Sequence, residues 1–423
     1  MASYPTFNPN DYGDSPEVAR RNRAVQDLYE PGSTFKIVTA SAALQEHVIT
    51  PDDLVDTQGG VIKFPGRKPI TDMGHNYGVL TFTDVIVKSS NVGAIKVGLK
   101  VGAERLGLYV KRFGFGHATS PDFPGESPGI VWDPAKMSDS ALASMSMGYQ
   151  VGVTPLQMVR AASAVANGGT LYEPHIVRAI VKGSQRTIVA PKPVRQAILP
   201  ETATTVREIM EKVVTNGTGK NARLVSYNVA GKTGTADKLI NGHYSGSQQN
   251  VSFVGFVPSR DPVFTIIVMI DAPRVGGDTG GAIAAPIWKR IADASLRIKG
   301  VTPTINPQPP VMVARIEPSP VTPAAATGDP SVMAIPANMT EAGLPDLRGK
   351  SARDAMHELA RLGLTVRMQG VGVVVDQDPP AGAPIEPGAT CTLVLNRQRA
   401  AQTARRGDAG SSTHQAGVVG EPR

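Results

Sequence analysis

The stretch Val229-Ala230-Gly231-Lys232-Thr233-Gly234-Thr235 decides the fold of the larger part of this 423-residue chain. Two apolar stretches rich in β-branched residues follow it, at 251–257 and 263–270, with turn residues between them. Runs of this composition predict strands that pair with their neighbours along the chain. We therefore expect an antiparallel sheet that carries the Lys-Thr-Gly string on one strand.

That string also has a chemical interpretation. Lys232 supplies positive charge, and Thr233 and Thr235 supply hydroxyls, a combination suited to a carboxylate. Gly234 would let the backbone of a ligand approach the strand edge. A peptide bound as an added strand would leave the Thr235 amide facing its scissile carbonyl. Lys-Thr-Gly should occur by chance in only about one chain in ten of this size, so the string is informative.

Upstream, Ser33-Thr34-Phe35-Lys36 follows the helix breakers Pro31-Gly32 and opens an apolar run, 35–44, that predicts a buried helix. Residues three apart share a helix face, so Lys36 should lie beside the Ser33 hydroxyl, and the helix start favours an oxyanion there. Burial would lower the pKa of Lys36 and make it a general base. Ser-x-x-Lys is expected about once or twice by chance in such a chain, and Ser33 could equally be an N-cap.

Ser89-Ser90-Asn91 lies between two helical stretches, 82–87 and 92–101, where polar side chains can point into a cleft. A second hydroxyl there could pass a proton to a leaving amine; the alternative is a polar helix joint. Ser226-Tyr227-Asn228 has the same Ser-x-Asn form. Because it adjoins the predicted Lys-Thr-Gly strand, we expect it to lead into that strand and not to face Ser33.

Gly217-Thr218-Gly219-Lys220 resembles part of a phosphate-binding loop. Asn221 stands where that motif requires Ser or Thr, and the leading glycine is absent. We therefore do not expect nucleotide binding.

Composition limits the other classes of function. The chain is 41% hydrophobic, enough for a large core, and its length indicates two or three domains. Its only cysteine, Cys391, excludes an intrachain disulfide, and no His-x-x-x-His pair occurs, so we expect neither a metal nor another cofactor. The net charge of +7 lies partly in a basic C-terminal tail without interleaved aromatic residues, which argues against nucleic-acid binding. No apolar run is long enough for a membrane span, and the first residues do not form a secretory signal.

The chain divides by composition. Residues 1–300 alternate helical and strand-like patterns and are expected to form one α/β domain, 301–338 form a proline-rich linker, and 339–397 form a small α+β domain. Within the small domain, Ser351 is a predicted N-cap with Asp354 three residues later, and strands are predicted at 364–368, 372–375 and 390–395. Residues 398–423 are expected to be disordered.

In this order, Ser-x-x-Lys, Ser-x-Asn and Lys-Thr-Gly are the signature of penicillin-recognising serine acyltransferases. The stretches 29–36, 148–157 and 230–236 resemble the class B penicillin-binding proteins almost letter for letter. The C-terminal module is similar to a PASTA domain. The resemblance covers 1–300 and 344–396, and it implies the penicillin-binding transpeptidase fold, an antiparallel sheet flanked by helices.

The resemblance implies a peptidoglycan D,D-transpeptidase. Ser33 would attack the terminal D-Ala-D-Ala link of a stem peptide and expel D-alanine, and an amine of a neighbouring stem would take the acyl group. The resemblance also implies roles for the other residues. Lys36 would accept the Ser33 proton, Ser89 would relay protons, and Asn91 would orient Lys36 and the substrate amide. Lys232, Thr233 and Thr235 would hold the carboxylate, and the Ser33 and Thr235 amides would form the oxyanion hole. β-Lactams would acylate Ser33.

The family also implies a place in the cell, namely the extracytoplasmic face of the membrane, with partners from cell division, elongation or sporulation. In the family a membrane anchor, a pedestal domain and the first strands of the sheet precede Ser-x-x-Lys, whereas 32 residues precede Ser33 here. We therefore expect an N-terminally truncated chain whose sheet lacks its first strands. The alternatives are a truncated non-catalytic protein that binds cell wall or β-lactams, and a β-lactamase; a kinase is excluded because its motifs are absent.

Overall fold

The computed structural model describes residues 1–274, 277, 279–305, 343–362, 364–370, 372–384 and 389–396. The chain forms two compact units, Met1–Ala314 and Arg315–Arg423. The expected linker beyond residue 305 and the expected tail at 398–423 lie outside the described residues.

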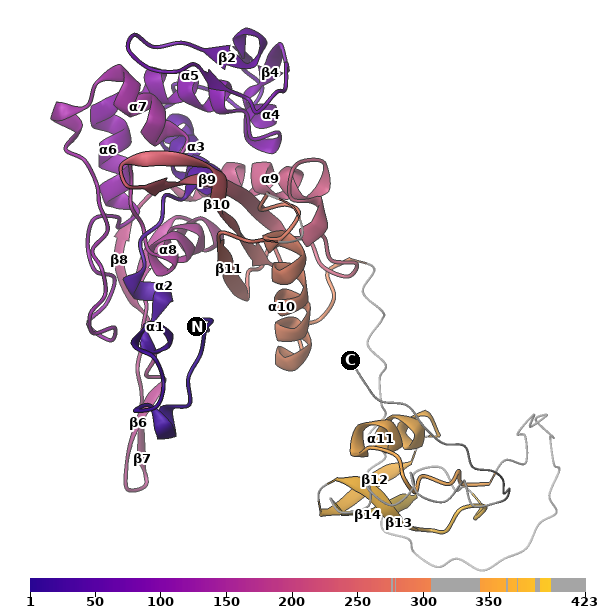
Figure 1. Ribbon diagram of the computed structural model, residues 1–423. Coiled ribbons are helices and arrows are strands. Elements are labelled where there is room, and N and C mark those ends of the chain that lie inside the picture. Colours follow the sequence, from indigo (N-terminus) through magenta and orange to yellow (C-terminus); the bar gives the residue numbers. More distant parts are fainter. Residues whose placement is uncertain are drawn as a thin grey trace, which may run out of the picture. The chain divides into compact units, whose positions relative to one another are not determined.

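The larger unit combines ten described α-helices with short 3-10 turns and strands (Figure 1). The helices are α1 (Glu17–Arg20), α2 (Arg23–Gln26), α3 (Lys36–Gln45), α4 (Phe82–Val87), α5 (Asn91–Val101), α6 (Ala103–Arg112), α7 (Asp139–Ser146), α8 (Pro155–Ala166), α9 (Pro200–Thr215) and α10 (Ala284–Lys299). The 3-10 turns are η1 (Pro9–Asp11), η2 (Gly32–Phe35), η3 (Gln58–Gly60), η4 (Pro134–Lys136) and η5 (Lys220–Ala222).

The main sheet has the order β11-β10-β9 and is antiparallel throughout. Its strands are β9 (Ala230–Ile240), β10 (His243–Val257) and β11 (Phe264–Asp271), which confirms the strands predicted around Lys-Thr-Gly. The described residues also form four separate two-stranded pairs: β1 (Leu54–Asp56) with β4 (Val79–Thr81), β2 (Val61–Ile62) with β3 (Ile70–Thr71), β5 (Thr170–Glu173) with β8 (Lys192–Gln196), and β6 (Ala179–Lys182) with β7 (Gln185–Ile188).

Helices cover both faces of this sheet because its side chains alternate between two hydrophobic cores. Val254 and Phe256 of β10 pack into the core formed with α3, α8 and α9, whereas Phe253 and Val257 pack against α10. Trp288 of α10 is fully buried there, and its ring meets Phe253 edge-on at 5.2 Å. Figure 1 shows α8 and α10 on opposite sides of the sheet. Burial on both faces holds β9, and with it the Lys-Thr-Gly string, rigidly.

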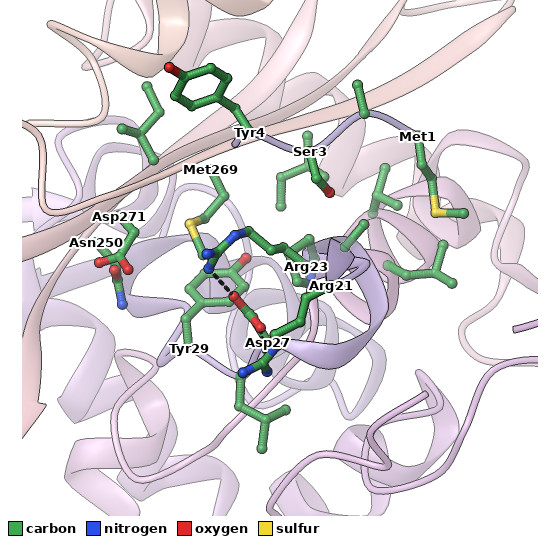
Figure 2. Close-up of a pocket in the computed structure, with 18 of the residues that line it drawn as sticks. Met1, Ser3, Tyr4, Arg21, Arg23, Asp27, Tyr29, Asn250, Met269 and Asp271 are labelled. Carbon is green, nitrogen blue, oxygen red and sulfur yellow. Dashed lines mark hydrogen bonds and ion pairs between the residues drawn. The ribbon is translucent and has the colours of Figure 1, made fainter. Parts of the chain in front are cut away.

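The outer edge of β11 pairs with no other strand in the described part of the chain. A cavity of about 880 Å³ lies beside that strand, between it and segments that include Met1 to Pro5, and Figure 2 shows the polar groups that line it. The Asp27 carboxylate accepts a hydrogen bond from Arg23 at 2.7 Å and forms an ion pair with Arg21 at 2.7 Å. None of the predicted site residues lines this cavity.

The smaller unit contains α11 (Ala352–Arg361) and the strands β12 (Thr365–Gly370), β13 (Val373–Asp378) and β14 (Thr390–Asn396). Their order is β12-β14-β13, with β14 parallel to β12 and antiparallel to β13. The Ser351 hydroxyl accepts from the Asp354 amide at 3.2 Å, so the predicted helix start is confirmed. Cys391 is buried in this small core as a free thiol.

None of the described helices has the length and apolar character that a bilayer crossing requires.

Candidate active site

Ser33 lies on the 3-10 turn η2 that leads directly into α3. Its side chain is half-buried and lines a cleft of about 1030 Å³. The turn is held from two sides: the Gly32 amide donates to Gly148 O at 3.0 Å, and a Cβ on Gly32 would stand 2.7 Å from Thr235 O. Ser33 is not the N-cap of α3. That position is Phe35, and its side chain makes no capping hydrogen bond. The N-cap alternative is therefore excluded.

Lys36 is the first residue of α3 and is fully buried. Its ammonium nitrogen donates to Ser89 O at 2.7 Å and to Asn91 Oδ1 at 2.8 Å, and Ser89 Oγ is 3.4 Å away. Burial lowers the pKa of Lys36 to about 7, against a smaller opposing effect of the Asp72 carboxylate. An amine with this pKa is partly unprotonated at neutral pH, as a general base requires.

Ser89 and Asn91 lie at the junction between α4 and α5. Ser89 has a left-handed backbone, with φ of 62°, and thereby separates the two helices. Ser90 is the N-cap of α5, since its hydroxyl accepts from the Gly93 amide at 2.9 Å. Because the middle serine takes the capping role, the Ser89 and Asn91 side chains remain available to the cleft, which both of them line.

Asp72 is the buried residue that fixes this junction. Its carboxylate accepts from Ser90 Oγ at 2.7 Å and from the amides of Asn91 and Val92 at 2.5 and 2.9 Å. A carboxylate at the first turn of α5 also interacts favourably with the helix dipole. Sequence reasoning missed Asp72, because no motif connects it to a helix that begins almost 20 residues later.

Lys232, on β9, completes the buried polar group. Its amine donates to Ser89 Oγ at 2.8 Å and to Thr233 O at 3.2 Å. Burial is the main cause that lowers the pKa of Lys232 well below its usual range, and the charge of Lys36 adds to it. Two buried lysines thus meet at one serine hydroxyl, and their mutual repulsion disfavours a proton on both at once.

Thr233, Gly234 and Thr235 lie on β9 with the Thr233 and Thr235 side chains lining the cleft. The structure gives Gly234 a packing role as well, because a Cβ there would stand 2.4 Å from Ser252 Oγ and 2.9 Å from Thr34 Cγ2. Glycine therefore lets β9 pack directly against the turn that carries Ser33.

The remaining strings behave differently. Ser226-Tyr227-Asn228 lies against the segment after α10, where the Tyr227 hydroxyl donates to Val301 O at 2.6 Å; this confirms that it does not face Ser33. Thr218, from the string resembling a phosphate loop, lines the cleft and lies 2.7 Å from Thr233 Oγ1, measured between hydroxyl oxygens. The sequence pattern alone indicates no role for Thr218. No group of His, Cys, Asp and Glu suited to a metal occurs within the described residues.

The fold and the arrangement of these residues resemble those of the penicillin-recognising serine acyltransferases. The comparisons agree: residues 1–293 match the family described as the penicillin binding protein transpeptidase domain, and 343–397 match the PASTA domain. The chain belongs to the penicillin-binding protein transpeptidase family. This confirms both the resemblance and the fold class expected from the sequence.

Relatives and solved structures support the assignment. The chain is 39% identical over 312 residues to stage V sporulation protein D of Bacillus subtilis, covering 72% of this chain and 48% of that protein. It is 34% identical to the peptidoglycan D,D-transpeptidase FtsI of Escherichia coli, covering 72% and 50%. Among solved structures, the transpeptidase domain of penicillin-binding protein 3 from Burkholderia pseudomallei is 35% identical with a TM-score of 0.62, covering 68% of this chain and 84% of that one. The chain thus spans about half the length of the curated relatives it matches.

Proposed function

We propose that this chain carries the catalytic domain of a peptidoglycan D,D-transpeptidase. Ser33 Oγ attacks the carbonyl carbon of the penultimate D-alanine of a stem peptide, the C–N bond to the terminal D-alanine breaks, and that D-alanine leaves as the free amine. An amine of a second stem peptide then attacks the Ser33 ester and releases the serine. The observation that carries the proposal is that Lys36 and Lys232 meet at Ser89, which lines the same cleft as Ser33.

Lys36 acts as the base for Ser33. An uncharged amine has two N–H donors and one lone pair, and Ser89 O and Asn91 Oδ1 accept from Lys36 at hydrogen-bond distance. These two bonds leave the lone pair free for the Ser33 proton. The lowered pKa of Lys36 supports this role, since it permits the uncharged form near neutral pH.

Ser89 relays the proton to the leaving amine. Its hydroxyl lies 3.4 Å from Lys36 Nζ and 2.8 Å from Lys232 Nζ, so it connects the base to the carboxylate end of the cleft. Lys232, Thr233 and Thr235 hold the terminal carboxylate, and Gly234 keeps the strand close to Ser33. The Ser33 and Thr235 amides serve as the oxyanion hole, for which the close packing of Gly32 on Thr235 O is supporting evidence.

The whole protein is proposed to act at the extracytoplasmic face of the cell membrane. Its substrates are peptidoglycan stem peptides, and β-lactams acylate it by imitating them. Its relatives include a stage V sporulation protein and FtsI, which favours partners from the sporulation or division machinery. The PASTA module is proposed to bind cell wall or to brace its neighbour.

Mass spectrometry of the intact protein after incubation with benzylpenicillin tests the proposal. We expect one adduct, located on the peptide that contains Ser33, and none in Ser33→Ala. Stoichiometric acylation followed by slow release supports a transpeptidase, whereas rapid turnover of nitrocefin would indicate a β-lactamase. Release of D-alanine from a pentapeptide substrate tests catalysis itself: acylation by penicillin without any such release would favour the non-catalytic binding protein.

A further inference from the structure

The loop 217–219, between α9 and η5, reaches the cleft beside Lys-Thr-Gly. Its two glycines are closely packed: a Cβ on Gly217 would stand 2.4 Å from Val87 O, which leaves no room for it, and one on Gly219 would stand 3.2 Å from the Phe253 ring, a tight contact. The Gly219 amide also donates to Val213 O at 3.0 Å. The loop is therefore packed tightly against α4, α9 and β10, and Thr218 is the one side chain that it presents to the cleft.

Thr218 Oγ1 lies 2.7 Å from Thr233 Oγ1, and Lys232 Nζ lies 3.5 Å from the same Thr233 oxygen. A hydroxyl has one proton to donate and two lone pairs that accept. When Lys232 and Thr218 both donate to Thr233, the proton of Thr233 is left for a ligand. When Thr233 donates to Thr218 instead, the proton of Thr218 is left. In either arrangement the pair offers one directed donor at this point of the cleft.

A second segment that lines the cleft, 279–282, is hydrogen-bonded to the residues that follow this loop. Asn221, three residues after Thr218, donates from Nδ2 to Gly281 O at 2.9 Å. The neighbouring Gly280 amide donates to Thr235 Oγ1 at 3.1 Å, which occupies an acceptor position of that hydroxyl and leaves its proton free. The threonine pair and Thr235 can therefore each donate one hydroxyl proton to a ligand near the Lys232 amine. Several hydrogen-bond donors grouped around an amine form a site for a carboxylate.

We propose that Thr218 is a substrate-binding residue that orients the Thr233 hydroxyl and selects ligands with a free terminal carboxylate. The inference rests on the proposed function, because the carboxylate meant is that of the terminal D-alanine or its β-lactam equivalent. Thr218 does not take part in the transfer of the acyl group. Its loss should therefore weaken acylation only for compounds that carry the charge.

Rates of acylation by benzylpenicillin and by its methyl ester test this proposal. Hydrogen bonds to charged groups contribute more than neutral ones, so we expect Thr218→Val to acylate with benzylpenicillin about tenfold or more slowly than the unchanged protein. With the methyl ester the difference should be less than about twofold, since the ester has no charge for the hydroxyls to bind. Thr218→Ser keeps the hydroxyl and should restore most of the rate.

The matched control is Thr215→Val, at the exposed end of α9, where the hydroxyl contacts only Lys212 O at 3.5 Å. It should acylate like the unchanged protein with both compounds. Equal rates for Thr218→Val and the unchanged protein would overturn the inference, and so would an equal loss with both compounds or a failure of Thr218→Ser to recover. Circular dichroism of each variant separates these results from misfolding. Absence of acylation in the unchanged protein would instead refute the proposed function, and the inference with it.

Discussion

Replacing Ser89 by alanine and, in parallel, by glycine separates its chemical role from its structural one. Both changes remove the hydroxyl that accepts from Lys232 at 2.8 Å and lies 3.4 Å from Lys36 Nζ. If that hydroxyl relays protons, acylation by benzylpenicillin should slow by about 10²- to 10⁴-fold in both variants, the range typical of a lost acid–base group.

The two variants should differ in stability. Loss of the hydroxyl deprives the buried Lys232 amine of its shortest hydrogen bond and should cost about 1–3 kcal/mol of unfolding free energy in each. Ser89 has φ of 62°, a conformation that costs a residue with a Cβ about 1–2 kcal/mol and glycine almost nothing. The greater conformational entropy of the unfolded glycine variant offsets about 0.4–1 kcal/mol of that advantage. Ser89→Gly should therefore be more stable than Ser89→Ala by roughly 0.5–1 kcal/mol.

Denaturant unfolding curves and stopped-flow acylation with a fluorescent penicillin measure the two effects on the same samples. Acylation of Ser89→Ala within about tenfold of the unchanged protein would refute the relay. A glycine variant less stable than the alanine variant would refute the argument from backbone strain.

Three further results are expected. The rate of Ser33 acylation should rise as the pH increases through about 7, because the lowered pKa of Lys36 means that its amine loses its proton there and becomes a base. A rate that is flat from pH 5 to 9, measured by stopped flow, would contradict this. Gly148→Ala should destabilise the protein by more than 2 kcal/mol, since its Cβ would stand 2.0 Å from Gly32 O, whereas Gly168→Ala, also at positive φ but with nothing within 4 Å, should cost only about 1 kcal/mol. Equal melting temperatures of the two would refute the packing argument. Thr154→Ala removes the capping box of α8 and should lower the free energy of unfolding by about 1 kcal/mol without slowing acylation. Denaturant unfolding and acylation rates measured on the same variant test this.

Local sequence signals were sufficient for several elements that depend on neighbouring residues. Helix 82–87 ends where it was predicted to end, and the predicted N-cap at Ser351 bonds to Asp354. The strands around Lys-Thr-Gly follow from their β-branched composition. In each case the controlling interaction joins residues close together in the chain, so the pattern along the sequence contains the information.

Other parts of the site had no such signal. Asp72 supports α5 from a separate segment, and Thr218 reaches Thr233 across 15 positions of sequence. Gly148 is required because Gly32 O approaches it, although the two lie on segments far apart in the chain. These contacts form only when helices and strands pack, and a single sequence does not state which distant residues will meet.

By itself, the sequence determined the chemical groups of the site and their order: a serine after a helix breaker, a lysine one turn later, a Ser-x-Asn junction, and a lysine on a strand. Only the tertiary structure decided that both lysines would be fully buried and would share the Ser89 hydroxyl. The physical reason is that their lowered pKa values come chiefly from removal of water. Water is removed where Lys36 of α3 and Lys232 of β9 meet the junction between α4 and α5, which are segments far apart in the chain.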